Sequence, residues 1–288
     1  MLVTGAAGMV GQAVCVYCES VGDIVFAYDR QSLDIADADR VRQAVQKDKP
    51  DAVINCAAWT DVDGCESNKE RAFAANARGP ENLAAPSREI DARLVTISTD
   101  YVFDGEKDGF YTQTDQPNPQ SIYGVSKLEG ERLAQSADPR AVVVRTGFVF
   151  GPGGSNFLST IVERARRGEK LKAICDAYGT PTYSSDLALR LRQLAQLDQP
   201  GIFHVVNSGP GVSYEEFARA ALDLAGFAAT NLETVTTDSL QRPAPRPRNS
   251  RLECLRSEAL GLRPLPFWRD SLRHFVGLGA RSEATARN

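Results

Sequence analysis

The sequence predicts an α/β fold, with a doubly wound parallel sheet in the first half and a smaller C-terminal lobe. Three observations favour this fold class. The first half alternates short apolar runs with helical patterns. The apolar runs are nearly continuous, as in parallel strands that helices cover on both faces. A glycine-rich turn also follows the first run and opens a helix. With right-handed crossovers these units give a doubly wound sheet.

The elements of the first half follow from these patterns in order. We expect strands at 2–4, 24–28, 51–55, 93–98 and 141–145. We expect helices at 9–19, 37–47, 66–90 and 122–135, the third bent near Gly79 and Pro80. The second of these helices opens on acidic residues, which suit a helix N-terminus.

The second half is less regular. Helices are expected at 155–167, 185–197 and 213–225, and a strand at 203–206. In the last helix, Ser213 as N-cap and Glu216 three residues later form a capping box. The proline-rich stretch 242–248 can be neither a helix nor a central strand, so it is expected to be a rigid loop. The polar stretch 279–288 is expected to be a disordered tail.

Composition excludes several classes of protein. The 288 residues suffice for a sizeable core, and the net charge of −4 argues against nucleic acid as the main partner. No apolar run approaches the roughly 18 residues that span a membrane, and we see no signal peptide, so the cytoplasm is the expected location. Cys15 and Cys18 form a CxxC without a second pair or a histidine cluster, so we expect them to pack rather than to bind metal.

The glycine turn predicts a dinucleotide site. Gly5 allows the tight turn, Gly8 lets the backbone approach a pyrophosphate, and Gly11 permits close helix packing. Met9 and Val10 open the helix, whose N-terminus favours phosphate charge. The spacing is GxxGxxG rather than the GxGxxG of larger dehydrogenase families.

The ends of the next two strands complete the predicted cofactor site. Asp29 ends the second strand, where a carboxylate commonly binds the adenosine ribose, and Arg30 could instead meet a 2′-phosphate. These two effects are opposed, so NADPH and NADH both remain candidates. Asp34 and Ile35 should lie near the adenine. Small residues end the third strand, at Cys56-Ala57-Ala58, which suits close passage of a cofactor, although small residues also simply pack well.

A tyrosine and a lysine four residues apart point to proton and hydride chemistry. Tyr123 and Lys127 share a helix face. We expect the ammonium to lower the pKa of the phenol, so that Tyr123 acts as a general acid or base, and to hold a cofactor ribose. Thr99 ends the fourth strand, and its hydroxyl can position the reacting oxygen. The alternative is an ordinary exposed helix pair, which the accompanying motifs disfavour.

Longer motifs resemble the extended short-chain dehydrogenase/reductase family, from Leu2 to about Phe275. Its general marks are the glycine turn and YxxxK. Within the family, the chain resembles the dTDP-4-dehydrorhamnose reductase branch. The marks of that branch are AAWTDVD at 57–63, STDYVFDG at 98–105, YGVSKLEGE at 123–131, RT at 145–146, NF at 156–157, DAYGTPT at 176–182 and RPRNSRL at 246–252. The resemblance implies reduction of the 4-keto group of dTDP-4-dehydro-L-rhamnose to dTDP-L-rhamnose with NADPH or NADH.

The resemblance also implies roles for particular residues. Thr99, Tyr123 and Lys127 match catalytic residues. Residues that match cofactor contacts are Ala58, Trp59 and Thr60. The substrate-binding residues expected from these motifs are Thr99, Asp100, Tyr101, Phe148, Asn156 and Arg248, and Arg246 and Arg251 are further candidates for the diphosphate. Phe148 stands where the branch often has tryptophan, and Ala177 replaces a usual glutamine, so the identity of the sugar stays open.

These expectations define a domain plan and its rivals. Residues 1–150 form the dinucleotide-binding domain, to which segments of the second half return, and 151–278 form the substrate-binding lobe. The expected partner is a nucleotide sugar, and a homodimer is one assembly that we consider. One rival is an epimerase or a reductase of another nucleotide sugar. A second is a non-catalytic regulatory subunit like that of methionine adenosyltransferase.

Overall fold

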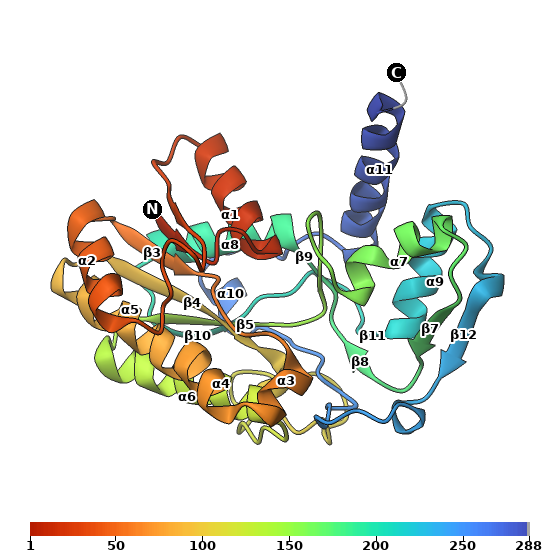
Figure 1. Cartoon of the computed structure of the whole chain (residues 1–288), viewed down its shortest axis with the longest axis horizontal. Coiled ribbons are helices and arrows are strands. Elements are labelled where there is room, and N and C mark those ends of the chain that lie inside the picture. Colours follow the sequence, from red (N-terminus) through yellow and green to blue (C-terminus); the bar gives the residue numbers. More distant parts are fainter. Residues whose placement is uncertain (287–288) are drawn as a thin grey trace.

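The computed structural model describes the backbone of residues 1–286 and the side chains of residues 1–278, and it contains the predicted parallel sheet (Figure 1). Six strands hydrogen-bond in the order β10-β5-β4-β3-β1-β2, and every neighbouring pair is parallel. The predicted fold class is therefore confirmed. The strands are β1 Leu2–Thr4, β2 Phe26–Tyr28, β3 Ala52–Asn55, β4 Arg93–Thr99, β5 Val142–Thr146 and β10 Gly201–His204.

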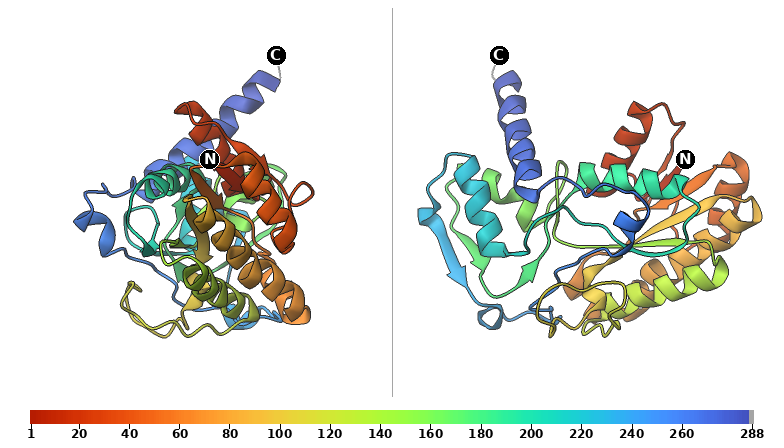
Figure 2. Two further views of the ribbon diagram at one scale, coloured as in Figure 1. Left: turned by 90° about the vertical axis from the view of Figure 1, so that its left-hand side faces the viewer. Right: turned by 180° about the vertical axis from the view of Figure 1, so that it is seen from behind.

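Helices cover both faces of this sheet (Figures 1 and 2). One face carries α1 Met9–Ser20 and α8 Ser184–Gln196, which pack on each other. The other carries α2 Ala38–Asp48, α5 Gly79–Glu89 and α6 Ile122–Ala137. Between β3 and α5 the chain forms the short helix α3 Val62–Ser67 and the helix α4 Lys69–Phe73, which a π-helical turn at Ala74–Arg78 joins to α5. The helix predicted at 66–90 is therefore present from Lys69 to Glu89, and its irregular turn lies directly before Gly79 and Pro80, where a bend was expected.

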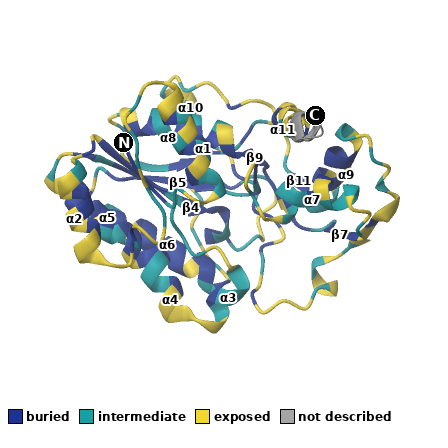
Figure 3. Ribbon diagram, turned by 45° about the horizontal axis from the view of Figure 1, so that its top comes forward, coloured by how far each residue is buried: buried dark blue, intermediate teal, exposed yellow. Residues whose placement is uncertain are grey.

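The strands read as apolar runs because both of their faces are buried (Figure 3). Successive strand residues point to opposite faces. Val3 and Ile54 accordingly pack with residues of α1 and α8, including Leu187. Leu2 and Val53 pack with residues of α2 and α5. β1 and β3 therefore each contribute to two cores at once.

The direction of strand addition reverses beside β1. The chain moves from β1 to β2 at one edge, then returns to β3 on the other side of β1. Ligands of open α/β sheets bind at such a switch point, outside the carboxyl ends of the strands. Here the loop after β1 touches the loop after β3: a Cβ atom on Gly5 would stand 2.7 Å from the amide nitrogen of Ala57.

The C-terminal lobe is built from short strand pairs and helices. β6 Val149–Phe150 pairs with β9 Thr182–Tyr183, β7 Leu171–Ile174 with β12 Leu232–Val235, and β8 Tyr178–Gly179 with β11 Val212–Ser213. Its helices are α7 Phe157–Arg166, α9 Tyr214–Leu224 and α11 Trp268–Ala286, whereas α10 Arg256–Ala259 lies beside β10, where Arg256 donates to the carbonyl oxygen of Ile202. Phe150, Phe217 and Trp268 are fully buried in its core. The capping box of Ser213 and Glu216 is present as predicted.

Three segments differ from the sequence expectations or extend them. β10 spans Gly201–His204 rather than 203–206, and it joins the main sheet beside β5. The backbone of α11 continues to Ala286, so the tail predicted as disordered is helical there, and residues 287–288 lie outside the described part. The division into domains at residue 150 stays a prediction. Among residues 1–286, no helix combines the length and the apolar character that crossing a membrane requires.

Candidate active site

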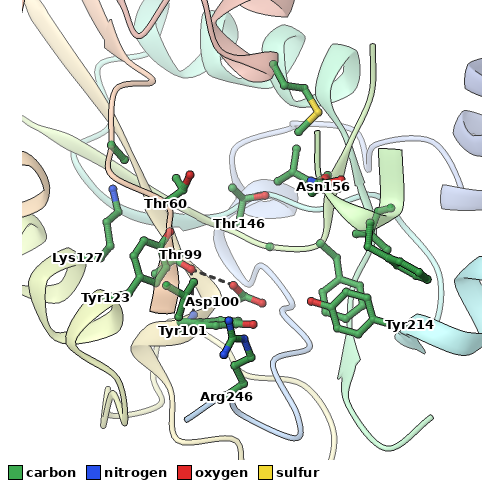
Figure 4. A pocket seen from close by; sticks show the side chains of 18 of the residues that line it. Thr60, Thr99, Asp100, Tyr101, Tyr123, Lys127, Thr146, Asn156, Tyr214 and Arg246 are labelled. Carbon is green, nitrogen blue, oxygen red and sulfur yellow. Dashed lines mark hydrogen bonds between the residues drawn. The ribbon is translucent and has the colours of Figure 1, made fainter. Parts of the chain in front are cut away.

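Two adjoining cavities lie at the carboxyl ends of the central strands. The larger, of about 640 Å³, reaches from the sheet to the C-terminal lobe (Figure 4). The smaller, of about 330 Å³, lies over the ends of β1, β2 and β3. The two share Cys56, Ala57 and Ala58. A dinucleotide could therefore extend from one cavity into the other past small side chains.

Most of the predicted site residues line one of these cavities. The larger is lined by Met9, Val10, Thr60, Thr99, Asp100, Tyr101, Tyr123, Lys127, Phe148 and Asn156. The smaller is lined by Gly5, Gly8, Asp29, Arg30, Asp34, Ile35 and Trp59. Three predicted residues, Gly11, Arg248 and Arg251, line neither of them.

The glycine turn fits the phosphates of a dinucleotide. Gly5 has φ +66°, a left-handed conformation that favours glycine. Gly11 lies behind the turn, where a Cβ atom would stand 2.1 Å from the carbonyl oxygen of Gly5. Gly8 is the N-cap of α1, and no side chain among the described residues caps the first turn. The N–H groups of that turn are thus available to an anion, and they carry the positive end of the helix dipole.

The adenosine end of the site offers opposed charges. The Asp29 carboxylate accepts hydrogen bonds from the backbone and hydroxyl of Ser32, at 2.8 and 2.7 Å. These bonds lower the pKa of Asp29 and keep it ionised. Arg30 is exposed and lies 3.8 Å from Asp34. An acid and a base therefore both border the smaller cavity, as the sequence predicted.

Asn76 fixes the backbone at Trp59, a role that the sequence analysis missed. Its side-chain oxygen accepts the Trp59 N–H at 2.8 Å, and its amide donates to the Trp59 carbonyl at 3.0 Å. Asn76 also donates to Ser126 of α6. The Arg71 guanidinium lies 4.3 Å above the Trp59 ring. Asn76 is buried. Its amide side chain within a run of alanines is the one signal in the sequence that could have indicated this contact.

Tyr123, Lys127 and Thr99 converge on the larger cavity (Figure 4). Ser121 caps α6 by accepting the Gly124 N–H at 3.1 Å, which places Tyr123 in the first turn. Lys127 is 4% exposed, and its ammonium donates to the carbonyl oxygen of Ile97 in β4 at 2.6 Å. Thr99 ends β4 and lines the same cavity. The helix and the strand end thus bring these three side chains together.

The pKa of Tyr123 corrects one sequence expectation. We expected the lysine to lower it, but burial is the largest effect and raises the pKa of the phenol well above its usual value, while a hydrogen bond with Thr99 opposes the rise. Burial also lowers the pKa of Lys127 to about 8, against the attraction of Glu131. The phenol is therefore protonated at neutral pH, in the form that can donate a proton.

Asp100 is a buried carboxyl beside these groups. Its Oδ1 accepts the Thr99 hydroxyl at 3.0 Å, and its Oδ2 has no hydrogen-bond partner among the described residues. Burial raises its pKa to about 6. Gly147 makes room for it, because a Cβ atom there would stand 2.2 Å from Asp100 Oδ2. An unsatisfied polar atom at a cavity wall is a place where a polar ligand would gain a hydrogen bond.

Aromatic side chains form the wall on the lobe side. Phe148 has φ +46°, a strained backbone conformation for a residue with a side chain. Its ring lies 4.2 Å from that of Tyr214, which begins α9 and also lines the cavity. Asn156 caps α7 and donates to the carbonyl of Val149 at 2.8 Å. The sequence predicted Phe148 and Asn156 but not Tyr214, because nothing in the chain places the start of α9 opposite residue 148.

The three arginines in and just after the proline-rich loop, Arg246, Arg248 and Arg251, have different surroundings. Arg246 lines the cavity and makes a bidentate ion pair with Asp63, at 2.9 and 2.8 Å. Arg248, the predicted substrate contact, is turned instead toward Asp238 at 2.7 Å and Asp176 at 3.8 Å, and its side chain is 58% exposed. Arg251 lies over the rings of Phe110 and Tyr178, outside the cavity. Arg246 and Arg248 are two residues apart and still turn to different partners, which the sequence could not reveal.

Comparisons with known proteins agree with this geometry. The family described as RmlD substrate binding domain matches residues 1–279. The chain is 40% identical over 279 residues to a dTDP-4-dehydrorhamnose reductase of Mycolicibacterium smegmatis, covering 96% of this chain and 84% of that protein. The chain belongs to this family. The resemblance to dTDP-4-dehydrorhamnose reductases that the motifs indicated is confirmed.

Solved structures of this family superpose closely on the chain. A dTDP-4-dehydrorhamnose reductase from Clostridium acetobutylicum aligns with a TM-score of 0.90 and 36% identity, over 96% of this chain and 98% of that one. The enzyme from Bacillus anthracis, solved in complex with NADP, aligns with a TM-score of 0.91 and 32% identity, over 95% and 97%. These two relatives therefore share the fold over nearly the whole length of the chain.

Proposed function

We propose that the chain is an oxidoreductase that uses NADPH or NADH to reduce the 4-keto group of dTDP-4-dehydro-L-rhamnose, yielding dTDP-L-rhamnose for nucleotide-sugar biosynthesis. One observation carries this proposal: Thr99, Tyr123 and Lys127 line the same cavity as Met9 and Val10 of the glycine turn. The proposed proton donor, the lysine and the proposed dinucleotide site therefore border the same cavity. The family membership of the chain supports the choice of substrate.

The reduction needs a hydride and a proton at the carbonyl group. A bound reduced nicotinamide cofactor supplies the hydride. Tyr123 gives its proton to the carbonyl oxygen, for which a buried and protonated phenol is suited. The hydroxyl of Thr99 holds that oxygen in place while negative charge develops on it. The positive charge of Lys127 stabilises the phenolate that Tyr123 leaves behind.

The chain offers a defined set of groups for the cofactor. The first turn of α1 would hold the pyrophosphate, and Lys127 the ribose next to the nicotinamide. The adenosine would occupy the smaller cavity between Ile35 and Trp59. Asp29 favours a ribose without a 2′-phosphate and Arg30 favours one that carries it, so both NADPH and NADH are proposed to serve.

The lobe supplies the contacts for the nucleotide sugar. The rings of Phe148 and Tyr214, tilted by 34° to each other, offer an aromatic wall for the thymine or the sugar. Arg246 enters the cavity with Asp63 fixing its orientation, and it replaces Arg248 as our candidate for the diphosphate. Asp100 offers its unsatisfied oxygen to a sugar hydroxyl.

Consumption of the reduced cofactor tests the proposal. Purified protein is supplied with NADPH and dTDP-4-dehydro-L-rhamnose, and the product is identified by mass spectrometry. We expect one cofactor oxidised per sugar reduced. Turnover without net oxidation would identify an epimerase, activity only with another 4-keto sugar would correct the substrate, and binding without turnover would favour a regulatory subunit. Tyr17→Phe, in α1 and outside the cavity, is the matched control for Tyr123→Phe.

Two further expectations accompany the function. We propose a homodimer as the working assembly, which sedimentation analysis would test. The cytoplasmic location also stays a prediction, and fractionation of cells that express the chain would test it.

A further inference from the structure

A buried ion pair lies directly behind the proposed catalytic groups. Glu131 follows Tyr123 and Lys127 at four-residue intervals on α6, so the three side chains share one helix face. The Glu131 carboxylate accepts two hydrogen bonds from Arg145 of β5, at 2.9 and 2.7 Å, and one from the hydroxyl of Ser98 in β4. Glu131 is 3% and Arg145 2% exposed.

This cluster connects the helix to the two strand ends that form the cavity floor. Ser98 and Arg145 are register partners in the sheet, and the next pair is Thr99 with Thr146. Both of these threonines line the larger cavity. Glu131 therefore holds α6 against Ser98, the residue before Thr99, and Lys127 holds it against the carbonyl oxygen of Ile97.

We propose that Glu131, held by Arg145 and Ser98, is a positioning residue for the reduction: its buried carboxylate fixes α6 against β4 and keeps the ammonium of Lys127 charged and in place. This inference rests on the function proposed above. It assigns Glu131 and Arg145 no contact with substrate or cofactor, because neither of them lines the cavity.

Electrostatics supports this role. Burial disfavours the ammonium of Lys127, and Glu131 opposes that effect. Cys56, after β3, is the other ionisable group that acts on Lys127, while Tyr123 precedes it on the same helix face, Asp100 lines the same cavity and Arg145 binds Glu131. The Cys56 thiol is neutral because burial raises its pKa. Glu131 is thus the neighbouring anion on which the charge of Lys127 depends.

The experiment compares Glu131→Gln with wild type across pH. Glutamine keeps the size of the side chain and removes its charge. We expect kcat to fall by about 10- to 100-fold, because small displacements of catalytic groups can cost up to about 100-fold. The alkaline limb of the profiles for kcat/KM and for NADPH affinity should move to lower pH, since the lysine loses its neighbouring anion. Glu129→Gln, two residues earlier on α6 and partly exposed, should leave both profiles unchanged.

Two further variants keep the inference falsifiable if the unpaired Arg145 prevents Glu131→Gln from folding. The double variant Glu131→Met with Arg145→Met removes both charges, a change that is often tolerated. Its alkaline limb should also move to lower pH, but by less than in Glu131→Gln, because the cation of Arg145 is lost together with the carboxylate. Glu131→Asp keeps the charge and should restore the position of that limb, even if kcat remains low.

The outcomes are distinct. A folded variant without the carboxylate whose alkaline limb stays in place would overturn the inference, since a merely structural residue lowers stability without moving the profile. NADPH affinity is measured by fluorescence without any sugar present. A shift in that profile would therefore support the role of Glu131 even if the wild type failed to reduce dTDP-4-dehydro-L-rhamnose, which would refute the proposed function alone.

Discussion

Replacing Asp100 by asparagine should remove a pH dependence from the stability of the fold. The carboxyl is 3% exposed, and burial raises its pKa from 3.8 to about 6. Asparagine has the same shape and can still accept the Thr99 hydroxyl, but it carries no charge at any pH. The variant therefore isolates the cost of the buried carboxylate.

The magnitude and the sign follow from linkage. The folded pKa lies above the unfolded one, so the favourable contribution is present below about pH 3.8 and is lost as the pH rises through about 6. A shift of roughly two units is worth roughly 3 kcal/mol, at about 1.4 kcal/mol per unit. Because part of the titration is complete at pH 4, the change between pH 4 and pH 7.5 should be about 2 kcal/mol.

Urea unfolding of both proteins at several pH values measures this quantity. The free energy of unfolding of the variant, relative to wild type, should rise by about 2 kcal/mol from pH 4 to pH 7.5. A constant offset from the new amide N–H does not matter, since only the change with pH is compared. Carboxylates elsewhere titrate equally in both proteins and cancel. Asp39→Asn, an exposed acid on α2, serves as the control.

The refuting result is equally definite. If the stability difference between Asp100→Asn and wild type were the same at pH 4 and pH 7.5, Asp100 would titrate alike in the folded and unfolded chain. Its carboxylate would then be solvated or paired, and the proposal that its free oxygen awaits a sugar hydroxyl would fail.

The remaining predictions concern activity. Tyr123→Phe should keep cofactor affinity and lower kcat by roughly 10²- to 10⁴-fold, the usual value of general acid catalysis; a near-normal rate would remove the phenol from the mechanism. Lys127→Ala should reduce both turnover and NADPH affinity, and unchanged affinity in a fluorescence titration would refute the ribose contact. Phe148→Ala should raise KM more than it lowers kcat, because a remote contact binds ground and transition states alike; unaltered affinity for the nucleotide sugar would contradict this. Wild type should use both cofactors. In kcat/KM, Arg30→Ala should shift the preference toward NADH and Asp29→Ala should shift it toward NADPH. A wild-type preference above roughly a thousandfold, about 4 kcal/mol, would show that one of these side chains points away from the ribose.

The sheet, its strands and the glycine turn could be predicted from the sequence alone. An apolar run such as the one within 51–55 has apolar side chains on both faces of the strand, and both faces must therefore be buried. The position of such runs along the chain consequently predicts the strands to within a residue or two. Gly5 and the YxxxK pair are likewise local: the turn depends on one φ value, and the shared face of Tyr123 and Lys127 depends on helix periodicity. These features needed no knowledge of distant contacts.

Which residues face the cavity, and how they are charged, depends instead on contacts between distant parts of the chain. Arg246 and Arg248 are two residues apart in one loop, and the partner on α3, Asp63, selects the first for the cavity. Tyr214 reaches Phe148 because α9 packs in the lobe beside residue 148. The pKa of Tyr123 rises rather than falls because the phenol is desolvated by every element that packs around it. The spacing of Tyr123 and Lys127 on a helix reveals only one of these neighbours, the lysine.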